Sequence, residues 1–71
     1  MLGKSKTRDE VAIEYGVVRK TLYNWMKTEN IILKGRLITP KEQEIIYRTF
    51  GIPQFLSKEE RNYYSRLFSE K

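Results

Sequence analysis

The stretch from Glu10 to Met26 reads EVAIEYGVVRKTLYNWM and decides the fold of the chain. Apolar residues recur at helical spacing on both sides of Gly16 when successive positions are placed at about 100° per residue. A glycine after such a pattern is a common stop signal, because glycine tolerates the left-handed conformation. The stretch therefore predicts two short helices joined at Gly16. Their apolar sides are Val11, Ala12 and Tyr15 in the first helix, and Val18, Thr21, Leu22, Trp25 and Met26 in the second.

The other side of the second helix, which runs from Val18 to Lys27, is polar and has no acidic residue. Its members are Arg19, Lys20, Tyr23, Asn24 and Lys27. An ordinary solvated helix face mixes charges of both signs. Lysine and arginine suit phosphates or guanine, and asparagine suits adenine. This side of the helix therefore predicts contact with nucleic acid.

Three capping boxes predict where the other helices begin. In a capping box a Ser or Thr side chain accepts a hydrogen bond from the backbone three residues on, and a Glu at that position bonds back. The pattern occurs at residues 7–10, 39–42 and 57–60. Gly51, followed by Pro53, is expected to end the helix that starts at Thr39. Together with the helix from Val18, these signals predict a mainly α fold of four helices.

Each of these helices has an apolar stripe that is most simply explained as core. In the helix from Pro40 the stripe consists of Ile45, Ile46, Thr49 and Phe50. Two apolar residues lie off their stripes: Ile13 lies opposite the first stripe, and Tyr47 points mostly away from that of the Pro40 helix. Each of the two needs a second neighbour or lies exposed.

The composition narrows the classes of function. The 71 residues include no Cys and no His, which excludes disulfides and thiolate sites and removes the usual general base. We therefore expect no enzymatic activity, no metal and no cofactor. The chain has 14 Lys and Arg against nine Asp and Glu, and this net charge of +5 favours a polyanionic partner. The first 40 residues hold +4 of it, from eight basic and four acidic residues.

The chain is predicted to be one domain, residues 7–71, preceded by a flexible basic arm of residues 1–6. The arm has no apolar stretch of the kind found in signal peptides. The longest apolar runs, such as Ile31–Leu33, are far too short to cross a bilayer. We therefore expect a cytoplasmic protein without membrane contact.

Residues 31–38 read IILKGRLI and allow two interpretations. Two β-rich runs flank Lys34-Gly35, which indicates a small hairpin, although Lys-Gly is a weaker turn signal than Asn-Gly. Such a hairpin would form a wing that holds Lys34 and Arg36 beside the second helix. The other interpretation is an extended connector whose isoleucines pack on the core.

The segment Glu10–Met26 closely resembles the helix-turn-helix of bacterial regulators and insertion-sequence transposases. The resemblance places Ala12 where the two helices cross and Gly16 at the left-handed turn. It implies that Val18–Lys27 is the recognition helix, which enters the major groove. Such proteins often have Ser or Thr at the position of Val18, so this helix departs from them in lacking a side-chain cap. More loosely, the order of elements is similar to the winged-helix domains of MerR-like regulators and phage excisionases.

These features together predict a small sequence-specific protein that binds double-stranded DNA, a transcriptional regulator of a prokaryote or phage. Phosphate contacts are also expected from the arm and from residues 31–38. The expected DNA-contacting residues are Val18, Arg19, Lys20, Tyr23, Asn24, Lys27, Lys34, Arg36, Lys4 and Lys6. An architectural recombination factor that resembles excisionase is one alternative, and a protein–protein adaptor is another.

The last helix carries an aromatic-rich face made of Tyr63, Tyr64, Leu67 and Phe68. We favour the interpretation that this face closes the core over Trp25 and the Pro40 helix. The other interpretation is that it binds a partner, either a second copy in a homodimer or a different protein. A dimer would match the habit of helix-turn-helix proteins of reading two half-sites.

Overall fold

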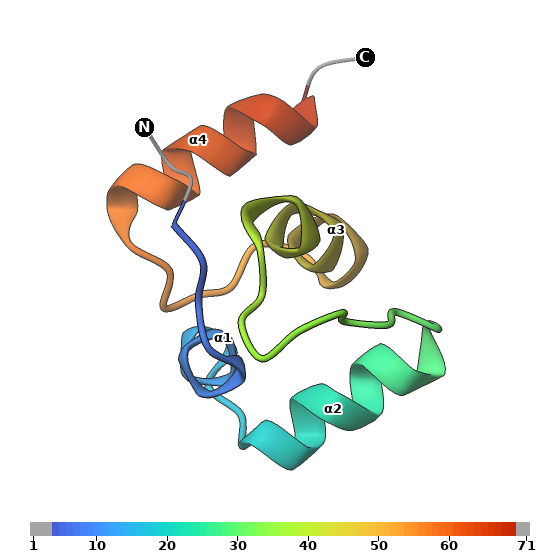
Figure 1. Ribbon diagram of the computed structural model, residues 1–71. Coiled ribbons are helices and arrows are strands. Elements are labelled where there is room, and N and C mark those ends of the chain that lie inside the picture. Colours follow the sequence, from blue (N-terminus) through green and yellow to red (C-terminus); the bar gives the residue numbers. More distant parts are fainter. Residues whose placement is uncertain (1–3, 70–71) are drawn as a thin grey trace.

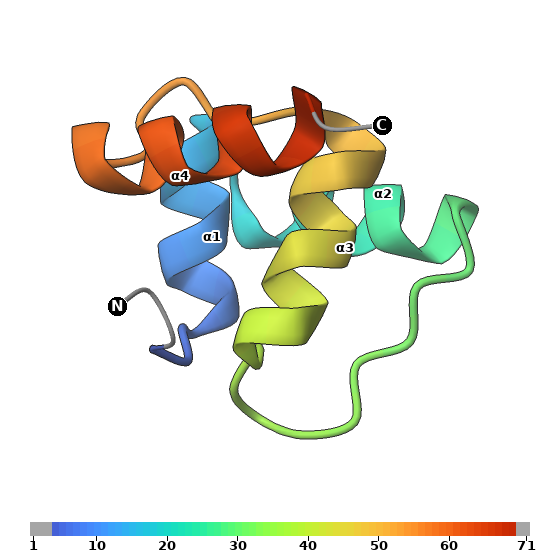
Figure 2. The ribbon, with the colours of Figure 1, turned by 90° about the horizontal axis from the view of Figure 1, so that it is seen from above.

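The computed structural model describes residues 4–69, and within them the chain forms four helices (Figure 1). Their bounds are α1 Arg8–Tyr15, α2 Arg19–Thr28, α3 Pro40–Phe50 and α4 Lys58–Ser69. In Figure 1 α1 and α3 lie in the middle, with α2 on one side of them and α4 on the other. Figure 2 looks from the side of α4, so that α4 crosses in front of α1 and α3 while α2 lies behind α3. The prediction of a mainly α fold with four helices is confirmed.

The predicted capping boxes account for the starts of α1 and α3. Thr7 and Thr39 each accept a hydrogen bond from the backbone three residues on, and the glutamate there bonds back to the N–H of the threonine. At α4 only half of the box forms. Ser57 accepts from the Glu60 backbone, but its hydroxyl donates to the Glu60 carboxylate. The other oxygen of that carboxylate pairs with Lys6, which explains why it does not reach back to the helix start.

The turn between α1 and α2 depends on Gly16, which has the predicted left-handed conformation with φ 71° and ψ 30°. A β-carbon at this position would also lie 2.9 Å from the exposed ring of Phe55, which would have to move, so the left-handed conformation is the main reason for glycine. Val18 then adopts the extended N-cap conformation of α2 without a side-chain hydrogen bond, as its apolar side chain predicts.

The core lies between the helices, and it includes Tyr47, for which the sequence left burial or exposure open. Tyr47 is fully buried, because both α1 and α4 contribute side chains that contact it. Ile46 is buried as predicted, but Ile45, expected on the core face of α3, is 45% exposed. Ile13 is 68% exposed, so it has found no second neighbour. The buried hydrophobic residues are Val11, Ala12, Leu22, Met26, Ile38, Ile46, Tyr47, Leu56 and Tyr64.

Residues 31–38 follow the connector interpretation, and the hairpin does not form. The backbone of Ile38 pairs with Lys6 in an isolated antiparallel bridge, with N···O distances of 3.0 and 2.7 Å. Ile38 thus finds its partner in the segment before α1, not across Lys34-Gly35. Ile31 and Leu33 pack against the core, whereas Ile32 is 84% exposed.

Within the predicted arm of residues 1–6, the same bridge attaches the part around Lys6 to the domain. Lys6 is buried and paired, and the carbonyl of Lys4 accepts a hydrogen bond of 2.8 Å from the side chain of Gln43 on α3. The backbone around these lysines is therefore part of the domain. Residues 1–3 lie outside the described residues.

The aromatic face of α4 packs mainly on the core, as we favoured. Tyr64 is 3% exposed and its ring contacts that of Tyr47 edge-on, with centroids 4.9 Å apart. Leu67 and Phe68 are half-buried against the same core. We expected this face to cover Trp25 as well. Instead, the ring of Trp25 contacts those of Tyr15 on α1 and Phe50 on α3. Tyr63 is 45% exposed at the edge of the face.

Candidate nucleic-acid interface

The outer side of α2 is an exposed face on the side of the molecule remote from α4 (Figure 1). The helix is held by Leu22 and Met26, which are buried in the core, and by the half-buried Trp25. Within α2 there is no acidic residue, and the next acid along the chain is Glu29 at its C-cap. The exposed residues that were predicted to contact DNA are Arg19, Lys20, Tyr23, Asn24 and Lys27.

Val18 belongs with this exposed face and not with the core. The helical spacing placed it on the apolar side of α2, but its side chain is 68% exposed. The reason is local: Val18 is the N-cap, and its extended backbone (φ −81°, ψ 159°) takes it out of the helical register. It therefore stands at the solvent-exposed start of α2, next to Arg19.

The acid that approaches this face is Asp9, on the first turn of α1. Its Oδ2 lies 3.9 Å from Nη1 of Arg19, and both side chains are 65% exposed. An exposed pair at this distance is screened by water and contributes little free energy. Arg19 is therefore free to exchange Asp9 for a stronger anionic partner such as a phosphate.

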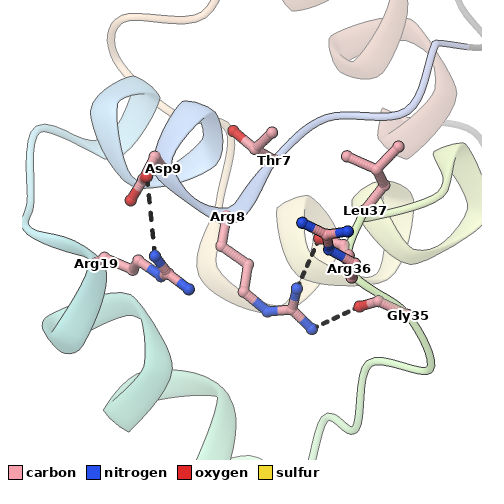
Figure 3. Close-up of a pocket in the computed structure, with 7 residues that line it drawn as sticks. All are labelled: Thr7, Arg8, Asp9, Arg19, Gly35, Arg36 and Leu37. Atoms are coloured by element: carbon pink, nitrogen blue, oxygen red, sulfur yellow. Dashed lines mark hydrogen bonds and ion pairs between the residues drawn. The ribbon is translucent and has the colours of Figure 1, made fainter.

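A groove beside α2 lies between the connector and the starts of α1 and α2. Figure 3 shows Arg8 reaching from α1 to the backbone of the connector, while Arg19 points to Asp9. The guanidinium of Arg8 donates hydrogen bonds of 2.7 Å each to the carbonyls of Gly35 and Arg36. The residues that line the groove are Thr7, Arg8, Asp9, Arg19, Gly35, Arg36 and Leu37.

Sequence reasoning missed Arg8, and no local signal distinguishes it. The positive end of the helix dipole disfavours a cation in the first helical turn, where acids are usual. Arg8 occupies the first position of α1 nonetheless. Arg19 and Lys58 begin α2 and α4 in the same way, so the position alone does not single out Arg8. Its partners are the two connector carbonyls.

The predicted phosphate-contacting residues outside α2 fall into two groups. Lys34 and Arg36 lie in the exposed part of the connector, and the backbone N–H of Lys34 donates to Glu42 at 3.3 Å. Lys4 has an exposed side chain before α1. Lys6 differs from these residues, and its predicted contact with phosphate needs correction, because Lys6 is 8% exposed and lies inside the molecule.

Lys6 belongs to a buried cluster together with Glu14, Tyr47 and Glu60. Its Nζ lies 2.5 Å from Glu14 Oε2, 2.8 Å from Glu60 Oε2 and 3.1 Å from the Tyr47 hydroxyl. The Tyr47 hydroxyl donates to Glu14 at 2.6 Å. Burial, reinforced by the hydrogen bond and charge of Glu14, raises the pKa of Tyr47 above its ordinary value. Because the Lys6 ammonium group is buried and paired with two carboxylates, it is not available to a phosphate.

Other kinds of site are not evident in the part of the chain that the structure describes. Between residues 4 and 69 no three His, Cys, Asp or Glu side chains are grouped to hold a metal ion. Over the same residues, no helix has the length and apolar character needed to cross a membrane.

No protein-family model matches the chain, and neither a search of curated proteins nor a search of solved structures finds a match.

Proposed function

We propose that the chain binds double-stranded DNA, with α1, the Gly16 turn and α2 acting as a helix-turn-helix. The observation that carries the proposal is the exposed face of α2, which presents three cations, an amide and a phenol and has no acid. An α-helix fits the major groove, and cations along it neutralise the flanking phosphates. The biological role that fits best is transcriptional regulation in a prokaryote or phage.

The residues of this face divide into two roles. Asn24 stands near the middle of α2 and is exposed, and an asparagine amide can bond an adenine edge in two places. Arg19, Lys20 and Lys27 lie towards the two ends of the helix, where phosphates or guanines are within reach. We expect Asn24 to read sequence and the cations to supply most of the affinity.

Asn24→Ala tests the base-reading role. Against a duplex selected from a random pool, the variant should lose about 1–3 kcal/mol of binding free energy, while binding of a scrambled duplex stays unchanged. Fluorescence anisotropy titrations of both duplexes measure this difference. Asn62→Ala is the matched control, since Asn62 is an exposed asparagine on α4. An equal loss on both duplexes would remove Asn24 from the reading of bases.

A protein that bends DNA for recombination is the second candidate, and one observation favours it. Ile32 is 84% exposed and lines a hollow together with Tyr23 and Lys27 of α2. Apolar side chains beside a DNA-binding surface can wedge between base steps and kink the duplex. Gel mobility of complexes on circularly permuted sites separates the two roles, because only a bent duplex migrates differently with the position of its site.

The adaptor role has less support than either DNA-binding role. The aromatic face of α4 that would contact a partner is largely used within the chain, since Tyr64 is buried and Leu67 and Phe68 are half-buried. A homodimer through this face would rest chiefly on Tyr63.

A further inference from the structure

The connector between α2 and α3 lies near α1, and one side chain of α1 bonds its middle part. The guanidinium of Arg8 uses Nη1 and Nη2 to bond two consecutive carbonyls, those of Arg36 and Gly35, at 2.7 Å each. Such a two-pronged bond fixes both distance and orientation, because the donors of arginine are set in a rigid plane. A lysine at the same position has no such plane.

Few other contacts hold this part of the connector. Residues 34–37 are exposed and belong to no strand. They are anchored at one end by the bond from the Lys34 N–H to Glu42 and at the other by the bridge at Ile38. Between these anchors, the position of the Arg36 backbone depends on Arg8.

The groove that results is positively charged and lies beside the proposed recognition helix. It is lined by three guanidinium groups, those of Arg8, Arg19 and Arg36, against the single carboxylate of Asp9. Arg8 and Arg19 also line a second hollow along α2, with Lys20 and Tyr23.

We infer that Arg8 is a positioning residue, which holds the connector against α1 so that Lys34 and Arg36 contact the phosphate backbone of the same duplex that α2 enters. The inference rests on the proposed function. Arg8 acts through the backbone of the connector, so its own charge is not the source of the contact. The interface then has two parts at a fixed spacing, the outer face of α2 and residues 34–36.

The test is a double-variant comparison of Arg8→Lys and Arg36→Ala by fluorescence anisotropy over a range of salt concentrations. Arg36→Ala removes an exposed side chain but keeps the carbonyl that Arg8 bonds, so we expect it to fold as the wild type does. It should weaken duplex binding several-fold and lower the slope of log affinity against log salt by about 0.9, the value for one phosphate contact.

Arg8→Lys keeps the charge but not the paired bonds, and it should lower affinity and slope by at least as much as Arg36→Ala. In the double variant the Arg36 substitution should add nothing further, because the connector is already displaced. Arg66→Ala, an exposed arginine on α4, is the control for loss of one charge. Amide chemical shifts of Gly35 and Arg36 in the free Arg8→Lys protein should move while those of α2 stay, which shows displacement without unfolding.

Losses that multiply in the double variant would overturn the positioning role, since independent effects mean that Arg8 makes its own contact. A second outcome concerns residues 34–36. If Arg36→Ala and Lys34→Ala bound the duplex as tightly as the wild type while Asn24→Ala bound it more weakly, residues 34–36 would not contact DNA, but the proposed function would stand. Absence of duplex binding by the wild-type protein at low salt would overturn the proposed function itself.

Discussion

At the scale of single residues, Lys6 shows that the place of a charge matters more than its presence. In the count of 14 basic residues it is equal to any other, but it lies between Glu14 and Glu60 with a side chain only 10% exposed. Desolvated charges are costly unless they are paired, so each member of this cluster requires the others. The cluster joins the segment before α1 to α1, α3 and α4 through one nitrogen atom.

Lys6→Met should therefore destabilise the fold by about 3 kcal/mol, because it keeps the aliphatic stem but leaves two partly buried carboxylates without their cation. Urea unfolding followed by circular dichroism measures the change. Lys4→Met is the control, since the Lys4 side chain is exposed. If both variants were equally stable, the pairing of Lys6 would contribute nothing.

At the scale of elements, α2 differs from α1 and α3 in the way it begins. Both of those helices start with a complete capping box, whereas α2 starts at Val18 without a side-chain hydrogen bond. The backbone of Val18 already has the conformation of an N-cap. What is missing is only an oxygen that accepts from the first turn.

Val18→Ser should supply this oxygen and stabilise the protein by about 1 kcal/mol. Thermal unfolding measures the gain, and Val18→Ala is the control, since it removes the exposed side chain without adding an acceptor. A serine variant no more stable than the alanine variant would mean that the start of α2 is satisfied by water.

The elements also show which features a sequence can predict. Local signals were sufficient for the capped starts of α1 and α3 and for the left-handed Gly16, because each involves residues within a few positions of one another. The sequence left open whether residues 31–38 form a hairpin or a connector, because the partner of Ile38 is Lys6, 32 positions earlier. Arg8 was missed for the same reason, since the carbonyls it bonds lie 27 and 28 positions away.

At the scale of the whole molecule, a chain of aromatic rings links all four helices. Trp25 of α2 contacts Tyr15 of α1, with ring centroids 5.6 Å apart, and Tyr15 contacts Tyr47 of α3 at 6.3 Å. Tyr47 in turn contacts Tyr64 of α4 at 4.9 Å. In this way the proposed recognition helix is attached to the far side of the molecule through one continuous set of contacts.

Three of these rings make the fold sensitive to alkali. Burial, aided by nearby carboxylates, raises the pKa of Tyr64 to about 12, and burial raises those of Tyr15 and Tyr47 further. In the unfolded chain tyrosine ionises near pH 10, so the neutral form is favoured by folding. This stabilisation is complete below about pH 10 and is lost as the pH rises towards the raised pKa values.

We expect cooperative unfolding above about pH 10, with the ultraviolet absorbance change of these tyrosinates appearing together with the loss of helical circular dichroism. Tyr64→Phe removes one of these ionising groups. The variant should therefore unfold at a higher pH than its stability at neutral pH would lead one to expect. Tyr23→Phe, at an exposed ring, serves as the control. Tyrosinate absorbance at these buried rings before any loss of helix would contradict this account.

The bridge between Lys6 and Ile38 has a consequence for measuring the motions of the chain. Each of the two residues donates its amide hydrogen to the carbonyl of the other, outside any helix. Hydrogen–deuterium exchange at these two amides therefore reports detachment of the segment before α1, separately from fraying of the helices. Exchange at the same slow rate as the amides of α3 would mean that this segment opens only when the whole protein does.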